Sequence, residues 1–130
     1  MLLFAIGCSD LINESDLESK RGLMYNPKNS KPYSGKVYKL YSTGSKMREG
    51  VFDLGAIDGS YTYYDNEGSI INPIEENKLD LKDGKKYFPG TDREYWGLAY
   101  GLYQTGEISY EVFYEGGKLS SEYTYFKLDG

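Results

Sequence analysis

The sequence predicts an all-β fold: an elongated antiparallel meander of β-hairpins, a repeat sheet formed by two tandem modules. Three observations lead to this prediction. The chain resembles itself at a fixed offset, it contains fifteen tyrosines and sixteen glycines among 130 residues, and its apolar residues show no helical period. Tyrosine is enriched in strands, and glycine in the tight turns that join them.

The repeat appears when the chain is shifted by 62 residues. Between Ile12/Ile74 and Gly68/Gly130, 20 of the 57 aligned pairs are identical, without a gap. Two glycines separated by eight residues mark shorter units, which begin at Gly35, Gly59, Gly97 and, with serine in place of glycine, Ser121. We therefore predict a first module over residues 9–72 and a second over residues 73–130, whose last unit is incomplete.

Each module is expected to begin with a lead hairpin that turns at Arg21-Gly22 or Asp83-Gly84, where both turn residues take a positive φ. In the first unit, residues 36–41 then form a strand, residues 42–44 a turn and residues 46–52 the return strand. The chain turns again at residues 53–55. Strands of about six residues joined by short turns form an antiparallel meander. The only helical feature expected is one turn near residues 13–18.

Side chains alternate between the two faces of a strand, so each unit presents two sets of residues. We assign the more uniformly apolar set to the core: Tyr38, Leu40, Thr62, Tyr64, Tyr100, Leu102, Thr124 and Phe126. The opposite face carries Val37 and Ala99 together with six rings, Tyr41, Tyr61, Tyr63, Tyr103, Tyr123 and Tyr125. Rings on neighbouring strands stabilise a thin sheet by about 0.2 to 1 kcal/mol per pair. The six rings are also the predicted binding residues, as an exposed aromatic strip.

The first eight residues resemble the end of a bacterial lipoprotein signal. An apolar run, MLLFAIG, precedes Cys8, the residue that would carry the lipid anchor. We interpret residues 1–8 as a signal segment whose beginning is truncated, and Cys8 as the lipidation site. The run is too short for a transmembrane helix, which needs about 20 apolar residues. The alternative is a cytosolic chain in which Cys8 is inert.

The recurrent phrase is a glycine, an aromatic strand ending in Tyr-Tyr or Leu-Tyr, a short polar turn and a second glycine. A strand containing Glu49 or Glu111 follows, with a further glycine at Gly55 or Gly117. This phrase resembles the bacterial MORN-repeat variant family, and the lead over residues 18–37 resembles its lipoprotein-like members. The resemblance implies an antiparallel sheet of hairpins without catalytic residues, in proteins often labelled antitoxin-like.

Composition excludes several classes of function. The net charge is −5 and no stripe of lysine or arginine is present, so the chain lacks the surface that a nucleic acid requires. There is no histidine and one cysteine, which excludes Cys/His zinc sites, internal disulfides and histidine-activated nucleophiles. An enzyme acting on sugars would need a pair of carboxylates such as Glu49 and Glu111. These two are equivalent positions of the repeat, one module apart, and solvated carboxylates on a strand are far commoner than a catalytic pair. We predict a protein that is not an enzyme and that has no cofactor or metal.

The function predicted is that of a binding or scaffold module for a protein or glycan partner. It is expected in the cell envelope, at the outer membrane or on the periplasmic face, with the lipid anchor at Cys8 as its only membrane contact. The alternative is a cytoplasmic antitoxin-like protein that neutralises a toxin by direct binding. An unpaired last strand would also allow two copies to pair edge to edge.

Overall fold

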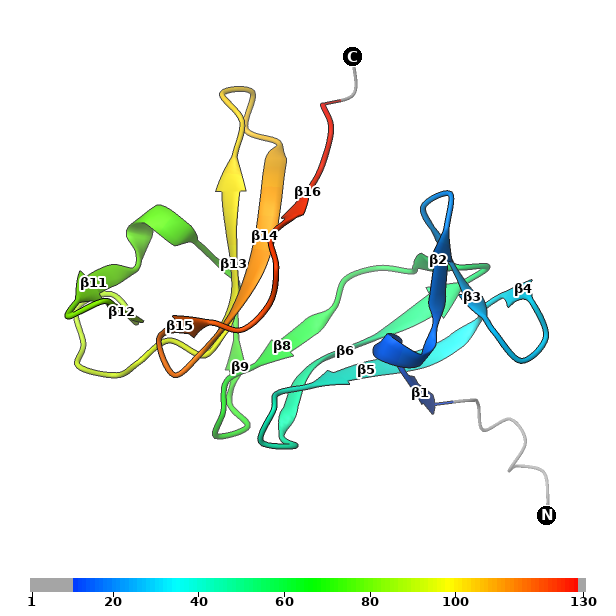
Figure 1. The fold of residues 1–130 in the computed structure, drawn as a ribbon, viewed down its shortest axis with the longest axis horizontal. Coiled ribbons are helices and arrows are strands. Elements are labelled where there is room, and N and C mark those ends of the chain that lie inside the picture. Colours follow the sequence, from blue (N-terminus) through cyan, green and yellow to red (C-terminus); the bar gives the residue numbers. More distant parts are fainter. Residues whose placement is uncertain (1–10, 129–130) are drawn as a thin grey trace. The chain divides into compact units, whose positions relative to one another are not determined.

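The computed structural model describes residues 11–128, and in that range it contains β-strands and two short 3₁₀ turns but no α-helix (Figure 1). The strands pair mainly as antiparallel hairpins, which confirms the predicted all-β class. The chain divides into two compact units, Met1–Thr62 and Tyr63–Gly130. This division falls earlier in the chain than the predicted module boundary at residues 72 and 73.

Unit 1 is built around one antiparallel hairpin. Its elements are β1 (Leu11–Asn13), η1 (Glu14–Asp16), β2 (Glu18–Lys20), β3 (Leu23–Asn26), β4 (Lys31–Pro32), β5 (Gly35–Leu40), β6 (Lys46–Asp53) and β7 (Ala56–Ile57). The hairpin is β5 with β6; β7 pairs with the end of β6, and β2, β3 and β4 form a small sheet. β1 pairs with β5 in parallel, which the predicted meander did not include. A parallel pair needs a crossover, and here η1 and the lead hairpin supply it.

Unit 2 repeats this plan after one further hairpin. Its elements are β8 (Thr62–Tyr64), which starts at the last residue of unit 1, β9 (Ile70–Ile71), β10 (Ile74–Glu75), η2 (Glu76–Lys78), β11 (Asp80–Lys82), β12 (Lys85–Tyr87), β13 (Gly97–Leu102), β14 (Ile108–Glu115), β15 (Lys118–Leu119) and β16 (Thr124–Tyr125). β8 pairs with β9, and β11 with β12. β10 runs parallel to β13, which forms the main hairpin with β14, and both β15 and β16 pair with β14.

The sequence repeat is a structural repeat. η2, β11, β13, β14 and β15 each begin and end 62 residues after η1, β2, β5, β6 and β7. Even the irregularity is repeated, because the register of the main hairpin shifts at Lys39/Leu40 and again at Gly101/Leu102. The lead turns also match the prediction, since Asp83 and Gly84 have φ of 52° and 79°. The 3₁₀ turn η1 is the helical turn expected near residues 13–18, whereas η2, its equivalent in the second repeat, was not expected.

In each repeat, the lead hairpin is held against the turn that follows the main hairpin. The Met24 N–H donates to the Gly55 carbonyl at 2.8 Å, and the Lys86 N–H donates to the Gly117 carbonyl at 2.8 Å. Both glycines have a positive φ, and an added Cβ would lie 2.9 Å from the Met24 oxygen or 2.8 Å from the Lys86 oxygen. No other residue fits these two positions without a shift of the backbone.

Each unit has its own hydrophobic core, to which the lead segment contributes. The core of unit 1 contains Leu17, Tyr33, Val37 and Phe52, and the core of unit 2 contains Leu79, Tyr95, Ala99, Val112 and Tyr114. A tyrosine hydroxyl is satisfied inside each core. Tyr33 donates to the Lys36 carbonyl at 2.9 Å, and Tyr95 donates to the Leu98 carbonyl at 2.7 Å.

The predicted core face is wrong. Val37 and Ala99 are fully buried, whereas Leu40 and Leu102 are exposed. Of the other residues assigned to the core, the structure leaves Thr124 and Phe126 exposed and Tyr38, Thr62, Tyr64 and Tyr100 half-buried. The reason is that the lead segment packs against the side of the hairpin that carries Val37 or Ala99. The apolar content of a strand face does not reveal which face an element from elsewhere in the chain covers.

Candidate functional site

The two repeats place a glutamate at the start of each 3₁₀ turn, and in the first repeat this glutamate is closed off by an arginine. Arg48 Nε donates to Glu14 Oε1 at 2.9 Å, and Arg48 Nη2 donates to Glu14 Oε2 at 2.8 Å. The Glu14 side chain is 8% exposed and the Arg48 side chain 12%. Arg48 Cζ also lies 3.9 Å from the centroid of the Tyr61 ring. The guanidinium is therefore bound to a carboxylate and stacked on an aromatic face at the same time.

In the second repeat, three tyrosine hydroxyls replace that arginine. Glu76 Oε1 accepts a hydrogen bond from Tyr110 at 2.7 Å, and Glu76 Oε2 accepts from Tyr114 at 2.5 Å and from Tyr123 at 2.9 Å. Tyr110 stands 62 residues after Arg48. Among residues 11–128, no lysine or arginine lies within ion-pair distance of Glu76, and its side chain is half-buried.

The hydrogen bonds fix the protonation states of this group. Burial raises the pKa of Glu76, but the three hydroxyls together outweigh burial, and the pKa lies below its ordinary value. Burial and the Glu76 carboxylate raise the pKa of Tyr110 to about 12, and they raise the pKa of Tyr114 and Tyr123 as well. At neutral pH the carboxylate is ionised and the three phenols are neutral donors.

A fourth ring, that of Tyr125, extends the group to the surface. The ring that it contacts, Tyr110, pairs across the hairpin with Gly101 and occupies the place that a Cβ on Gly101 would take. The centroid of this ring lies 5.2 Å from that of Tyr123 and 6.0 Å from that of Tyr125. The Tyr123 and Tyr125 rings are nearly parallel, with centroids 6.0 Å apart, and Tyr125 is 72% exposed. We call Tyr110, Tyr114, Tyr123 and Tyr125, with Glu76, the tyrosine cluster.

The structure separates the predicted binding rings. Tyr41 is 2% exposed, so its predicted place on an exposed strip is wrong: the face that carries it is the core face. The half-buried rings are Tyr61, Tyr63, Tyr103 and Tyr123. Tyr61 packs against Phe52 and Arg48 in the first repeat, and Tyr103 donates its hydroxyl to the Phe126 carbonyl. Only Tyr123 and Tyr125 come together in the tyrosine cluster. Cys8, the predicted lipidation site, lies outside the described residues.

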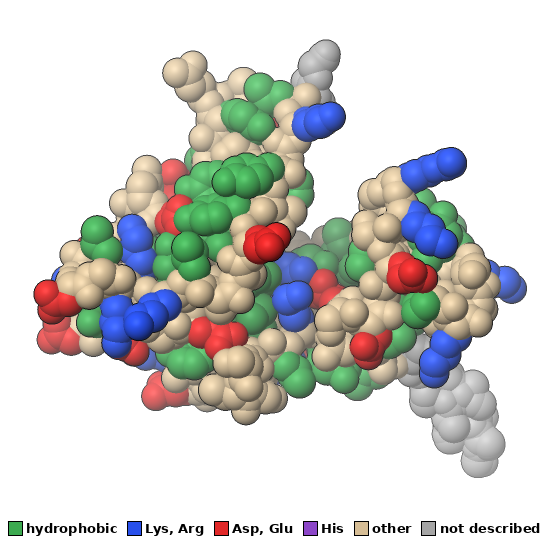
Figure 2. Space-filling view, in the orientation of Figure 1, with side chains coloured by type: hydrophobic (Ala, Val, Ile, Leu, Met, Phe, Trp, Pro, Cys, Tyr) green, Lys and Arg blue, Asp and Glu red, His purple; other side chains and the backbone are tan. Residues whose placement is uncertain are grey.

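Other apolar side chains are exposed where β13 turns into β14 and in the segment from Phe126 onward, which bonds to Ser109 beside that turn. They are Leu102, Ile108, Phe126 and Leu128. Figure 2 shows hydrophobic side chains gathered over the part of unit 2 that holds β14 and β16, with acidic side chains beside them. Contiguous exposed apolar area, with aromatic rings in it, is typical of a surface that binds another molecule.

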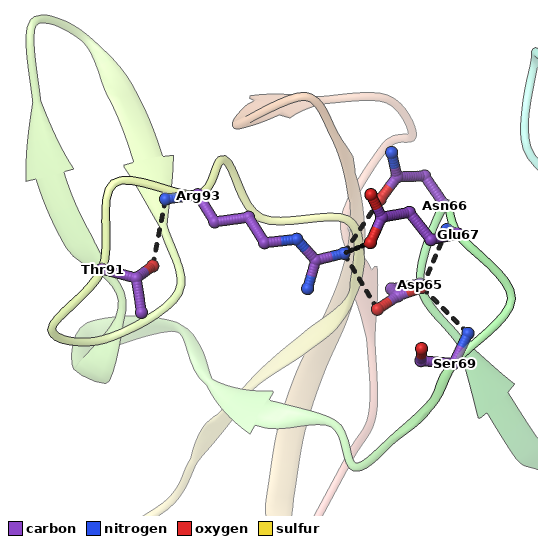
Figure 3. Close-up of polar contacts among 6 residues, drawn as sticks. All are labelled: Asp65, Asn66, Glu67, Ser69, Thr91 and Arg93. Atoms are coloured by element: carbon purple, nitrogen blue, oxygen red, sulfur yellow. Dashed lines mark hydrogen bonds and ion pairs between the residues drawn. The ribbon is translucent and has the colours of Figure 1, made fainter.

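A second buried carboxylate in unit 2 has a structural role. Figure 3 shows Arg93 extended toward Asp65, and its Nη2 donates to Asp65 Oδ2 at 2.9 Å. Asp65 Oδ1 accepts from the N–H groups of Glu67 and Ser69. Burial raises the pKa of Asp65, but these donors outweigh burial and the pKa lies below its ordinary value. The carboxylate is fully partnered and fastens the Arg93 loop to the turn between β8 and β9.

Sequence reasoning did not single out Glu14, Glu76, Arg48, Tyr110 or Tyr114. A signal for them was present in the repeat. Glu14 and Glu76 are one of the identical pairs at the offset of 62, whereas Arg48 is aligned with Tyr110. A constant acidic residue opposite a changed partner marks a position where the two repeats use different chemistry.

Three further findings concern the classes of function considered from the sequence. Glu49, one of the two carboxylates considered for catalysis, forms an ion pair with Lys46 at 2.8 Å on the surface of unit 1. Within residues 11–128, no group of three or more acidic or cysteine side chains could hold a metal ion. The same residues include no helix of the length and apolar character needed to span a membrane.

In comparisons with protein-family models, with curated proteins and with solved structures, the chain matches none of them. The resemblance to the MORN-repeat variant family therefore stays a prediction from the sequence.

Proposed function

We propose that this chain is a non-enzymatic binding module, tethered to a membrane of the cell envelope through Cys8, which presents the tyrosine cluster to a protein partner. The observation that supports this proposal best is Tyr125, a 72% exposed ring that its neighbours already hold in place. An ordered ring loses little conformational entropy on binding, and tyrosine is enriched at the energetic centres of interfaces.

The electrostatics of the cluster favour recognition over catalysis. A general base must accept a proton near neutral pH, but the pKa of Glu76 is lowered and its oxygens already accept three hydrogen bonds. A nucleophilic phenolate would need a lowered pKa, whereas those of Tyr110, Tyr114 and Tyr123 are raised. Groups fixed in this way supply hydrogen bonds and aromatic surface to a partner.

Site-specific photo-crosslinking tests the binding surface. A photoreactive phenylalanine analogue at position 125 of the full-length protein, in its native cells, is expected to capture one defined partner. The matched control carries the same analogue at Leu81, which is similarly exposed at 65% but lies on β11. Capture that is equal at both positions, or absent at position 125, contradicts the proposed surface.

The tether is tested separately. In the full-length gene with its natural upstream sequence, Cys8→Ser is expected to abolish lipid modification and to move the protein out of the membrane fraction. If neither its mass nor its fractionation changes, the anchor is wrong. A protein that stays in the soluble fraction and still captures a partner at position 125 supports the antitoxin-like alternative.

A further inference from the structure

The first repeat shows which group fits against a glutamate in this position. There the group is a guanidinium, which makes two hydrogen bonds to Glu14 and lies 3.9 Å above the Tyr61 ring. The arginine covers the carboxylate, so that both side chains are almost fully buried. In the first repeat, the cation that binds the glutamate and the ring is therefore a residue of the same repeat.

The second repeat keeps the glutamate and the ring but has lost the arginine. Glu76 stands for Glu14, and Tyr123 stands for Tyr61. The residue in place of Arg48 is Tyr110, whose ring lies on Gly101, where the first repeat has Lys39. Glu76 is half-buried and so in part accessible to solvent, whereas Glu14 is buried.

The surroundings of Glu76 are otherwise suited to a cation. Lys86 acts on its charge without forming an ion pair with it in the described part of the chain. The stacked rings of Tyr123 and Tyr125 offer an exposed aromatic face beside it, and the protein as a whole carries a net charge of −5. Tyrosine faces attract cations, and a negative surface attracts basic partners.

We propose that Glu76, Tyr123 and Tyr125 form a binding site for an arginine side chain of a protein partner, which takes the part that Arg48 plays in the first repeat. The guanidinium donates to the Glu76 carboxylate and lies over the Tyr123–Tyr125 pair. The hydroxyls of Tyr110 and Tyr123 then turn to solvent or share the carboxylate. This inference rests on the proposed function and names the chemistry of the partner.

Arginine suits this site better than lysine for a geometric reason. A guanidinium is planar, so it can stack on a ring while its edge donates two hydrogen bonds to one carboxylate. An ammonium is a compact, strongly hydrated charge and cannot do both in the same way. A lysine is expected to bind, but more weakly.

The probe is the peptide acetyl-Gly-Arg-Gly-amide, titrated into the whole protein while the tyrosine ring signals are followed by NMR. We expect the signals of Tyr123 and Tyr125 to shift and those of Tyr87, in the lead hairpin, to stay. The peptide with citrulline in place of arginine has the same shape without the charge, and should bind about tenfold more weakly or worse. Equal binding of the two peptides overturns the inference.

Two variants sharpen the test. Tyr110→Arg places an arginine where the first repeat has one, so it is expected to occupy Glu76 and to weaken peptide binding by about tenfold or more. Glu76→Gln removes the charge but keeps a side chain of the same size, and a similar loss is expected. NMR dispersion shows whether each variant is folded; should one unfold, the other and the citrulline peptide still decide.

The outcomes separate this inference from the proposed function. If Tyr110→Arg leaves peptide binding unchanged, or if the arginine peptide shifts no ring, the arginine site is wrong. If crosslinking at position 125 still captures the partner in the Tyr110→Arg variant, the surface binds through other contacts and only the arginine site fails. Neutral oligosaccharides that shift the same rings while the arginine peptide does not would assign the surface to a glycan.

Discussion

Two glutamates at equivalent positions of one chain are held by different chemistry. Glu14 is bound by a single buried arginine, whereas Glu76 is shared by three tyrosine hydroxyls. The backbone around them is the same: the strands, the register shifts and the glycine turns that bind the lead hairpins all match. Glycines and the buried tyrosine of each core determine the backbone of each repeat. The side chains that contact the glutamate can therefore differ, forming a buried ion pair in one repeat and a partly exposed aromatic group in the other.

The largest difference between the repeats is expected when each glutamate is removed. Glu14→Ala removes the carboxylate that neutralises the nearly buried Arg48 guanidinium, which should lower the free energy of unfolding by about 3 kcal/mol. Glu76→Ala leaves three neutral hydroxyls in a half-buried site that water can reach. It should therefore lower the free energy of unfolding by only about 1 kcal/mol. Hydrogen exchange assigned to β5 and β13 measures each repeat by itself. Equal losses of unfolding free energy in the two repeats would show that the buried ion pair stabilises its repeat no more than the three hydroxyl hydrogen bonds stabilise theirs.

The turns at Gly55 and Gly117, which bind the lead hairpins, are expected to be equally intolerant of a side chain. Gly117→Ala forces a Cβ to within 2.8 Å of the Lys86 oxygen at a φ of 79°, and we expect a loss of about 2 to 3 kcal/mol in urea denaturation. Gly106→Ala is the matched control, because its φ is 93° but nothing lies within 4 Å. It should cost about 1 kcal/mol. If the two substitutions cost the same, the contact with the lead hairpin contributes nothing.

The cores differ by an exchange of size between paired residues. Val37 stands opposite Gly50 in unit 1, whereas Ala99 stands opposite Val112 in unit 2. Val37→Ala and Gly50→Val should each cost about 2 kcal/mol, the first by a cavity and the second by contact with Ile57 and Tyr61. The double variant copies unit 2 and should cost at least about 1 kcal/mol less than the sum. Strict additivity in a double-mutant cycle would argue against compensation.

The smallest expected effect is the pH dependence of stability that comes from the tyrosine cluster. It is absent near neutral pH and grows in alkali. The unfolded chain loses the Tyr110 proton at its ordinary pKa of 10.0, but the folded state holds it to about 12. The stability from this group is therefore complete below pH 10 and is lost as the pH rises through 12. The lowered pKa of Glu76 acts in the opposite range: its contribution is present above 4.5 and is lost as the pH falls.

Tyrosinate absorbance, combined with thermal unfolding between pH 8 and 12, measures the alkaline effect. Glu76→Gln is the control, since without the carboxylate the Tyr110 pKa should move back toward its ordinary value. An alkaline transition that is identical in this variant would mean that Glu76 does not set the titration.

Much of the fold follows from the sequence because its signals are local. The offset of 62 fixes which residues are equivalent, and turn residues such as Asp83-Gly84 fix where the hairpins reverse. The core face could not be predicted in the same way, because what buries Val37 comes from Leu17 and Tyr33 in the lead segment. The parallel strand β1 was missed for a related reason: three residues have no period of their own, and their partner lies beyond a crossover.

The candidate site was predicted in part. Tyr123 and Tyr125 were expected from strand alternation, and they do lie together. Glu76 and Tyr110 were not expected, because their contact joins residues 34 positions apart across a 3₁₀ turn and a strand. Tyr41 was misplaced because it follows directly after β5 and is buried on the side of the hairpin that the core uses.

The self-contained core of the first repeat has a consequence for synthesis. Its core residues, and the partly buried ones that pack on them, all lie between Ile12 and Tyr61. A chain growing on the ribosome can therefore bury these side chains before the second copy has been translated. Since the main hairpins of the two copies have strands of the same length and register, this order of events keeps each strand from pairing with its counterpart in the other copy.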